Sequence, residues 1–169
     1  MTRLADLFDS FILDLDGVVY VGEEAVPGSP ETVNTLLRAG KAVRFLTNDP
    51  HHRRAEYAAK LRRLGMEVTP EHVVAVGWAM ARYLQGQGYA GATAFVVGSD
   101  ALKVEVAAAG LRVVDGADGP HARVVVLGSH PGLTYAELRT AIQAALRGAL
   151  LLGASRDPIF PMPDGPWPG

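Results

Sequence analysis

Short apolar runs and helix-like segments alternate along this chain, and the alternation restricts the fold that it can adopt. In the first half, apolar runs at 11–15 and 42–46 are each followed by a segment with helical spacing, at 29–40 and 51–64. A run of about five apolar residues that ends in a turn is typical of a buried strand. Strands that alternate with helices pair in parallel, so the chain is predicted to have an α/β fold.

The second half repeats the same order of elements. Three strands and two helices are predicted there, at 95–97, 124–127, 149–152, 101–109 and 133–146. A glycine-rich stretch at 83–91 marks a nearby boundary, so we expect two α/β units, over residues 1–76 and 77–169. The Gly-Ser turns at 98–99 and 128–129 lack the spaced glycines of a dinucleotide-binding loop and are interpreted as plain strand-to-helix turns.

Composition excludes several classes of protein. The 169 residues suit one large domain or two small ones, and 49% apolar with 20% charged residues is ordinary for a globular protein. A net charge of −2 predicts no general attraction to nucleic acid or to an anionic membrane. The chain has no cysteine, which excludes disulfides, thiolate catalysis and zinc–thiolate sites. Without a signal-peptide core or a membrane-length apolar stretch, the expected location is the cytoplasm.

Two further segments, 51–54 and 157–169, are predicted to have structural roles. Residues 51–54 have the sequence HHRR and are predicted to form the solvated first turn of the helix at 51–64. Residues 157–169 hold five of the eleven prolines, so neither a helix nor a central strand is expected there. The segment is nevertheless too apolar for a solvated tail, and we expect an ordered loop. Its apolar residues are Ile159, Phe160, Met162 and Trp167.

Asp14 and Asp16 stand where the first predicted strand ends. Side chains two residues apart on a strand point the same way, so the two carboxylates are expected to lie side by side. In open α/β sheets the carboxyl edge is where ligands bind. Two neighbouring carboxylates are costly unless they share a cation or a proton, which indicates a functional pair.

Three interpretations of this pair were compared. A calcium loop of the EF-hand type needs glycine at its sixth position and glutamate at its twelfth, where this chain has Val19 and Ala25. That interpretation is excluded. The pair could cap a surface turn, or it could combine an aspartate nucleophile with an aspartate acid–base over a magnesium ion.

The end of the second predicted strand favours the catalytic interpretation. Thr47, Asn48 and Asp49 follow that strand at the same edge of the sheet. Thr47 offers a hydroxyl, and the backbone N–H groups of the next two residues lie near a helix start, where phosphate is often bound. The sequence therefore predicts a phosphate site at this edge.

These residues also carry a family resemblance. FILDLDGVVY followed by FLTND resembles the first two motifs of the haloacid dehalogenase (HAD) superfamily, in its phosphatase branch. The likeness extends over nearly the whole chain and is strongest to the subfamily of the NagD-like and 4-nitrophenyl phosphatases. It implies an α/β architecture with a HAD-like Rossmannoid core built on a parallel sheet, incomplete in this chain, followed by an α/β cap domain. The final stretch, from Gly153, is similar to the substrate loop of that cap.

The resemblance implies a role for each candidate residue of the core. Asp14 would be the nucleophile and a magnesium ligand. Asp16 would be the acid–base and would offer its backbone carbonyl to the metal. Thr47, Asn48 and Asp49 would hold the transferring phosphoryl group. Asp49 replaces the usual asparagine, and its side chain is expected to point away from the phosphate.

The resemblance also implies a cofactor, partners and a missing part. The implied cofactor is Mg²⁺, and the implied substrate is a small phosphorylated metabolite. Phe160 would contact that substrate through stacking or apolar packing. The resemblance also allows a homodimer formed through the cap. The superfamily needs a further lysine and further metal-binding acids, which follow the cap. We therefore expect this chain to be the N-terminal part of a longer phosphatase, inactive alone. The alternative is a phosphate-binding or protein-interaction module without catalysis.

Overall fold

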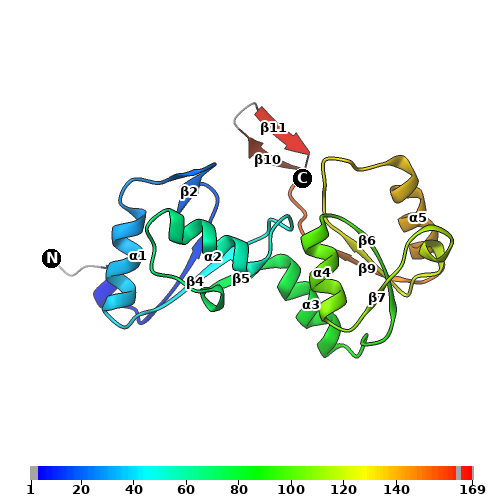
Figure 1. Cartoon of the computed structure of the whole chain (residues 1–169), viewed down its shortest axis with the longest axis horizontal. Coiled ribbons are helices and arrows are strands. Elements are labelled where there is room, and N and C mark those ends of the chain that lie inside the picture. The colour runs from blue at the N-terminus through cyan, green and yellow to red at the C-terminus, as the bar shows by residue number, and fades with distance from the viewer. Residues whose placement is uncertain (1–3, 163–164, 169) are drawn as a thin grey trace. The chain divides into compact units, whose positions relative to one another are not determined.

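The computed structural model describes residues 4–162 and 165–168, apart from the side chains of 160–162 and 166–168. Two compact units are present (Figure 1). The first contains the described residues up to Thr47, residues 54–74 and Met162. The second contains 48–53, 75–161 and 165–168. The short segment 48–53 thus leaves the first unit after Thr47, belongs to the second, and rejoins the first at Arg54.

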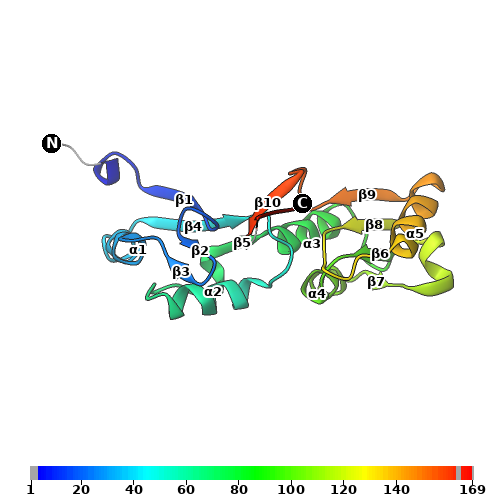
Figure 2. The same ribbon diagram turned by 90° about the horizontal axis from the view of Figure 1, so that it is seen from above.

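A parallel strand pair forms the centre of the first unit. Strands β1 (Ser10–Asp14) and β4 (Ala42–Thr47) are parallel neighbours in a three-stranded sheet of order β1-β4-β5, with β5 at Val73–Ala75. Helices α1 (Ser29–Arg38) and α2 (Arg54–Arg63) lie on one side of the β1–β4 pair (Figure 2). The smaller elements are η1 (Leu4–Asp6), β2 (Tyr20–Val21), β3 (Glu24–Ala25) and η2 (Pro70–His72).

The two faces of this sheet differ in burial. Val43, Phe45 and Thr47 of β4 are buried, because strand side chains alternate and these point to the covered face. On the other face Ile12 is 72% exposed and Leu46 48% exposed. The helix predicted at 29–40 is confirmed, since α1 begins at Ser29 with Gly28 as its cap residue. The Ser29 hydroxyl donates to the Val19 carbonyl at 2.7 Å.

The predicted start of α2 is wrong. This helix begins at Arg54 and not at residue 51. Pro50 and an Asp49 side chain that accepts the backbone N–H of His51 keep residues 49–53 in a turn. His51 and His52 therefore precede the helix. The prediction that they form its first turn is wrong.

The second unit is a four-stranded parallel sheet of order β7-β6-β8-β9 with helices on both faces. Its elements are α3 (Val76–Gly86), β6 (Thr93–Val97), α4 (Asp100–Ala108), β7 (Arg112–Val113), η3 (Gly116–His121), β8 (Val124–Leu127), α5 (Tyr135–Leu146) and β9 (Leu150–Gly153). Helices α3 and α4 lie on one side of the sheet and α5 on the other (Figure 1). The predicted α/β class is confirmed, with all five predicted strands and four predicted helices within a few residues.

Helix α3 was not predicted, since the glycines at 86, 88 and 91 suggested only a boundary. The helix ends at Gly86, and Met80, Ala81 and Leu84 are buried against α4 and the sheet. The buried residues of α3 follow helical spacing, so apolar packing of this one face stabilises the helix.

The C-terminal segment differs from the expected loop. Strands β10 (Ile159–Met162) and β11 (Gly165–Pro168) form a two-stranded sheet. Each is an edge strand, the position where proline is tolerated. Within the described residues, no helix has the length and apolar character needed to cross a membrane.

Candidate active site

Asp14 and Asp16 stand at the carboxyl edge of the first unit's sheet. Asp14 is the last residue of β1, and both side chains are exposed. Because β1 and β4 are parallel with Asp14 opposite Leu46, Thr47 lies one residue further along β4 at the same edge. Thr47 is 5% exposed and is the one buried polar side chain among the described residues. The structure thus brings Asp14, Asp16 and Thr47 to one edge.

A tight turn after β1 shapes this edge. Leu15 is fully buried, and its carbonyl accepts the N–H groups of Val19 and Tyr20 at 2.9 and 3.3 Å. Gly17 has φ +79°, a left-handed conformation that a side chain would strain. The Tyr20 hydroxyl lies 3.5 Å from Asp16 Oδ2. Burial of Leu15 between two exposed acids leaves both carboxylates on the outer side of the turn.

The carboxylate oxygens at this edge are the kind of ligand that Mg²⁺ prefers. Mg²⁺ prefers oxygen ligands and usually keeps several waters, so two carboxylates can hold it with water completing the shell. Asp14 Oδ1 accepts the Leu15 N–H at 2.8 Å and keeps its second oxygen for a ligand. No group of three His, Cys, Asp or Glu side chains gathers around a metal position anywhere in the described part of the chain.

The other candidate residues belong to the second unit. The Asn48 amide donates to Ser155 Oγ at 3.3 Å and to Asp157 Oδ2 at 2.5 Å. Asp49 Oδ1 accepts the His51 backbone N–H at 2.9 Å and lies 2.5 Å from His51 Nδ1. The side chain of Phe160, in β10, lies outside the described part of the structure.

The Asp49–His51 pair has an electrostatic consequence. The hydrogen bond to Asp49 raises the pKa of His51 above its usual value, while partial burial of the ring opposes this shift. A protonated His51 offsets the charge of the Asp49 carboxylate. His51 was not identified as a site residue from the sequence, because nothing in the pattern relates it to Asp49.

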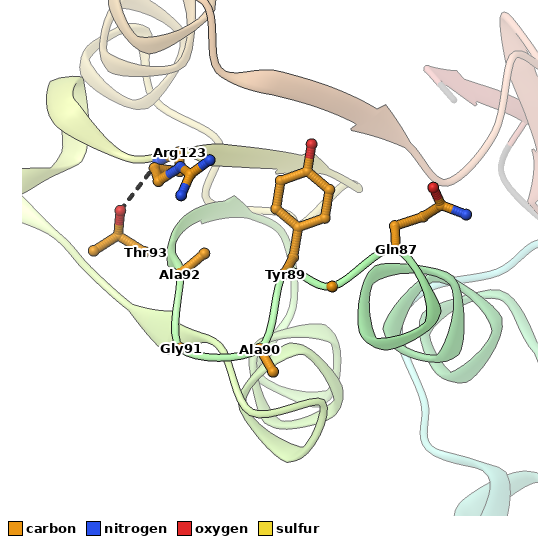
Figure 3. A pocket seen from close by; sticks show the side chains of 8 residues that line it. Gln87, Tyr89, Ala90, Gly91, Ala92, Thr93 and Arg123 are labelled. Atoms are coloured by element: carbon orange, nitrogen blue, oxygen red, sulfur yellow. Dashed lines mark hydrogen bonds between the residues drawn. The ribbon is translucent and has the colours of Figure 1, made fainter.

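A shallow pocket lies at the opposite, amino edge of the second unit's sheet (Figure 3). Thr93 opens β6, and its hydroxyl accepts the backbone N–H of Arg123 at 3.0 Å, just before β8. None of the candidate site residues lines this pocket.

Comparison with known proteins identifies the family. The sequence profile of the haloacid dehalogenase-like hydrolases matches residues 11–112, more than half of the chain. The chain belongs to the haloacid dehalogenase-like hydrolases. The resemblance noted in the sequence is therefore confirmed.

Members of this family with named activities are similar to the chain. Glycerol-3-phosphate phosphatase of Gallus gallus is 35% identical over 93% of this chain and 56% of its own length. Human chronophin is 38% identical over 91% of this chain and 56% of its own length. The chain spans about half the length of these curated relatives.

Solved structures of the family share the fold. Glycerol phosphate phosphatase of Mycobacterium tuberculosis in complex with magnesium has a TM-score of 0.88 at 35% identity, covering 100% of this chain and 50% of its own. The same enzyme has also been solved in complex with calcium. The p-nitrophenyl phosphatase of Archaeoglobus fulgidus has a TM-score of 0.88 at 31% identity and covers 95% of this chain and 60% of its own.

Proposed function

We propose that the protein to which this chain belongs is a magnesium-dependent phosphate monoester hydrolase acting on a small phosphorylated metabolite. One observation carries the proposal: two exposed carboxylates, Asp14 and Asp16, and the buried Thr47 stand at the same carboxyl edge of a parallel sheet. The named phosphatases among the relatives support it. The cytoplasmic location and the homodimer remain predictions.

The residues of this edge divide the reaction between them. An Asp14 carboxylate oxygen attacks phosphorus, the bond to the leaving oxygen breaks, and an aspartyl phosphate forms. Asp16, protonated at the start, gives its proton to the leaving oxygen. As a carboxylate it then takes a proton from water, which attacks phosphorus and releases phosphate and Asp14. The Thr47 hydroxyl donates to a phosphoryl oxygen. Magnesium held by Asp14 and Asp16 would offset phosphate charge.

The two units receive distinct roles in this proposal. The first would be the N-terminal part of the catalytic core and the second the cap that selects the substrate. Phe160 of β10 would contact the organic part of the substrate by stacking or apolar packing. The relatives' greater length and the exposed Ile12 and Leu46 support a longer protein whose remainder completes the core.

A second candidate is a phosphate-binding module without catalysis. The lysines favour it, because each of the three contacts a carboxylate other than those of Asp14 and Asp16. Lys41 pairs with Asp9, Lys60 with Glu23 and Lys103 with Asp100. The chain by itself would then bind phosphate without hydrolysing its esters.

Turnover of p-nitrophenyl phosphate by the full-length protein, with and without EDTA, tests the proposal. We expect activity with magnesium and its loss with the chelator. Activity that survives metal removal would contradict the mechanism. Phosphate binding without turnover would favour the module.

A further inference from the structure

Three neighbouring strands of the second unit each lead into a serine. Ser99 follows β6 by two residues, Ser129 follows β8 by two, and Ser155 follows β9 by two. Since β6, β8 and β9 are adjacent and parallel, the three serines lie along one carboxyl edge. We call this row of hydroxyls the serine edge.

Segment 48–53 is bound along the serine edge. Ser99 Oγ donates to the Pro50 carbonyl at 2.7 Å. Ser129 Oγ lies 3.4 Å from His51 Nε2. Ser155 Oγ accepts the Asn48 amide at 3.3 Å. Three hydroxyls from three strands therefore contact three of the six residues in one short segment.

The edge is shaped for close approach of this segment. A Cβ at Gly128 would come within 2.8 Å of Leu102 Cδ2 and 3.3 Å of Pro50 Cγ. Pro50 is buried, and Leu102 is 1% exposed. A side chain at position 128 would therefore force Leu102 to move and crowd Pro50.

The contacts also fix the charges around the segment. Ser129 Oγ contacts Nε2 of His51, and Nδ1 of His51 contacts the Asp49 carboxylate. Ser129 and His51 thus hold the Asp49 carboxylate in sequence. Ser155 donates to Asp157 Oδ2 at 2.9 Å, and Asp157 accepts the Asn48 amide. Other charged groups nearby are paired separately. Arg53 lies 3.7 Å from Glu105, and His130 lies 3.1 Å from Glu137.

We propose that Ser129 and Ser155, together with Ser99, are positioning residues that hold segment 48–53 so that Asn48 and Asp49 are oriented for a phosphoryl group. The phosphate-binding part of this inference rests on the proposed function. The docking of segment 48–53 on the serine edge does not. Because segment 48–53 follows Thr47 directly, the hydroxyls of the second unit restrain the residues that continue the phosphate-binding sequence.

Hydrogen exchange of the 169-residue chain, followed by NMR, tests the docking. Ser129→Ala and Ser155→Ala each remove one hydroxyl. We expect the amides of residues 48, 49 and 51–53 to exchange about fivefold faster, as the loss of one ordinary hydrogen bond predicts. Ser155→Thr should restore protection. Ser99→Ala is less informative, because Ser99 also caps α4 by accepting the Leu102 N–H. The matched control is Thr93→Val, which removes a hydroxyl contact at the opposite edge of the same sheet (Figure 3).

Titration with inorganic phosphate and magnesium, followed at the amides of 47–49, tests the positioning. We expect binding to weaken several-fold in both serine variants and to stay unchanged in Thr93→Val. Unchanged exchange in the serine variants would overturn the docking. Faster exchange with unchanged phosphate binding would overturn the positioning role and leave the phosphatase proposal intact. Absence of any phosphate response in the unmodified chain would overturn the phosphate role of this segment, while the exchange result would still decide the docking.

Discussion

At the scale of single residues, Asp14 and Asp16 have different surroundings. Asp14 and Asp16 share the exposed edge after β1, separated by the buried Leu15. Asp14 bonds to the next backbone N–H, and Asp16 lies near the Tyr20 hydroxyl. These different surroundings agree with the proposed nucleophile and acid–base roles, and substitution can separate them.

Asp14→Asn in the full-length protein is expected to abolish turnover, because an amide cannot form the acyl phosphate. Asp16→Asn should lose roughly two to four orders of magnitude in kcat, the range for one acid–base group. Thr47→Ala should lose less. Steady-state kinetics on p-nitrophenyl phosphate measure all three, and an Asp14→Asn enzyme that keeps most of its activity would refute the nucleophile.

His51 is expected to make stability depend on pH. Its pKa in the folded chain is raised by Asp49, so the pair's contribution is fully present below the unfolded value of about 6.5 and is lost as pH rises through the folded pKa. Asp49→Asn should lower the His51 pKa. NMR titration of the imidazole and urea unfolding at pH 5.5 and 8.5 measure both effects. An unchanged His51 pKa in the variant would show that Asp49 is not the cause.

At the scale of elements, parallel strands bring residues distant in sequence to one edge. In the first unit β1 and β4 align Asp14 with Leu46 and so bring Thr47 to the same sheet edge as the carboxylates. In the second unit β6, β8 and β9 align three serines against segment 48–53. The close packing at Gly128 is part of this second arrangement.

Gly128→Ala is expected to destabilise the chain by about 1–3 kcal/mol, since the added methyl group would contact Leu102 and Pro50 in a filled site. Gly86→Ala is the matched control, because no neighbouring atom lies within 4 Å of its Cβ. That change lies in α3 and should be neutral or stabilise by up to about 1 kcal/mol. Chemical denaturation compares the two variants, and equal stabilities would show that Gly128 is not tightly packed.

At the scale of the whole molecule, the chain covers about half of its relatives and divides into two units. The second unit has a sheet covered on both faces. In the first, the outer face keeps Ile12 and Leu46 exposed. The described residues supply two carboxylates to the candidate metal site and no cluster of three ligands.

The 169-residue chain is therefore expected to bind magnesium weakly, with a Kd on the order of millimolar, and to show almost no phosphatase turnover. Two carboxylates provide only part of an octahedral shell. Isothermal titration with MgCl₂ and a p-nitrophenyl phosphate assay beside the full-length protein measure both. A tight magnesium site in the short chain would contradict this expectation.

The sequence by itself determined the α/β class, the family, and most strands and helices, because these depend on local apolar periodicity and on two short motifs. It also indicated Asp14, Asp16 and Thr47, since Asp14 and Thr47 end strands and Asp16 follows Asp14 by two residues. The structure added that α3 is a helix and that α2 begins at Arg54. Only the tertiary structure decided that segment 48–53 is held by Ser99, Ser129 and Ser155. Those three contacts join residues 49, 78 and 107 positions apart, and no local pattern encodes which strand ends will meet.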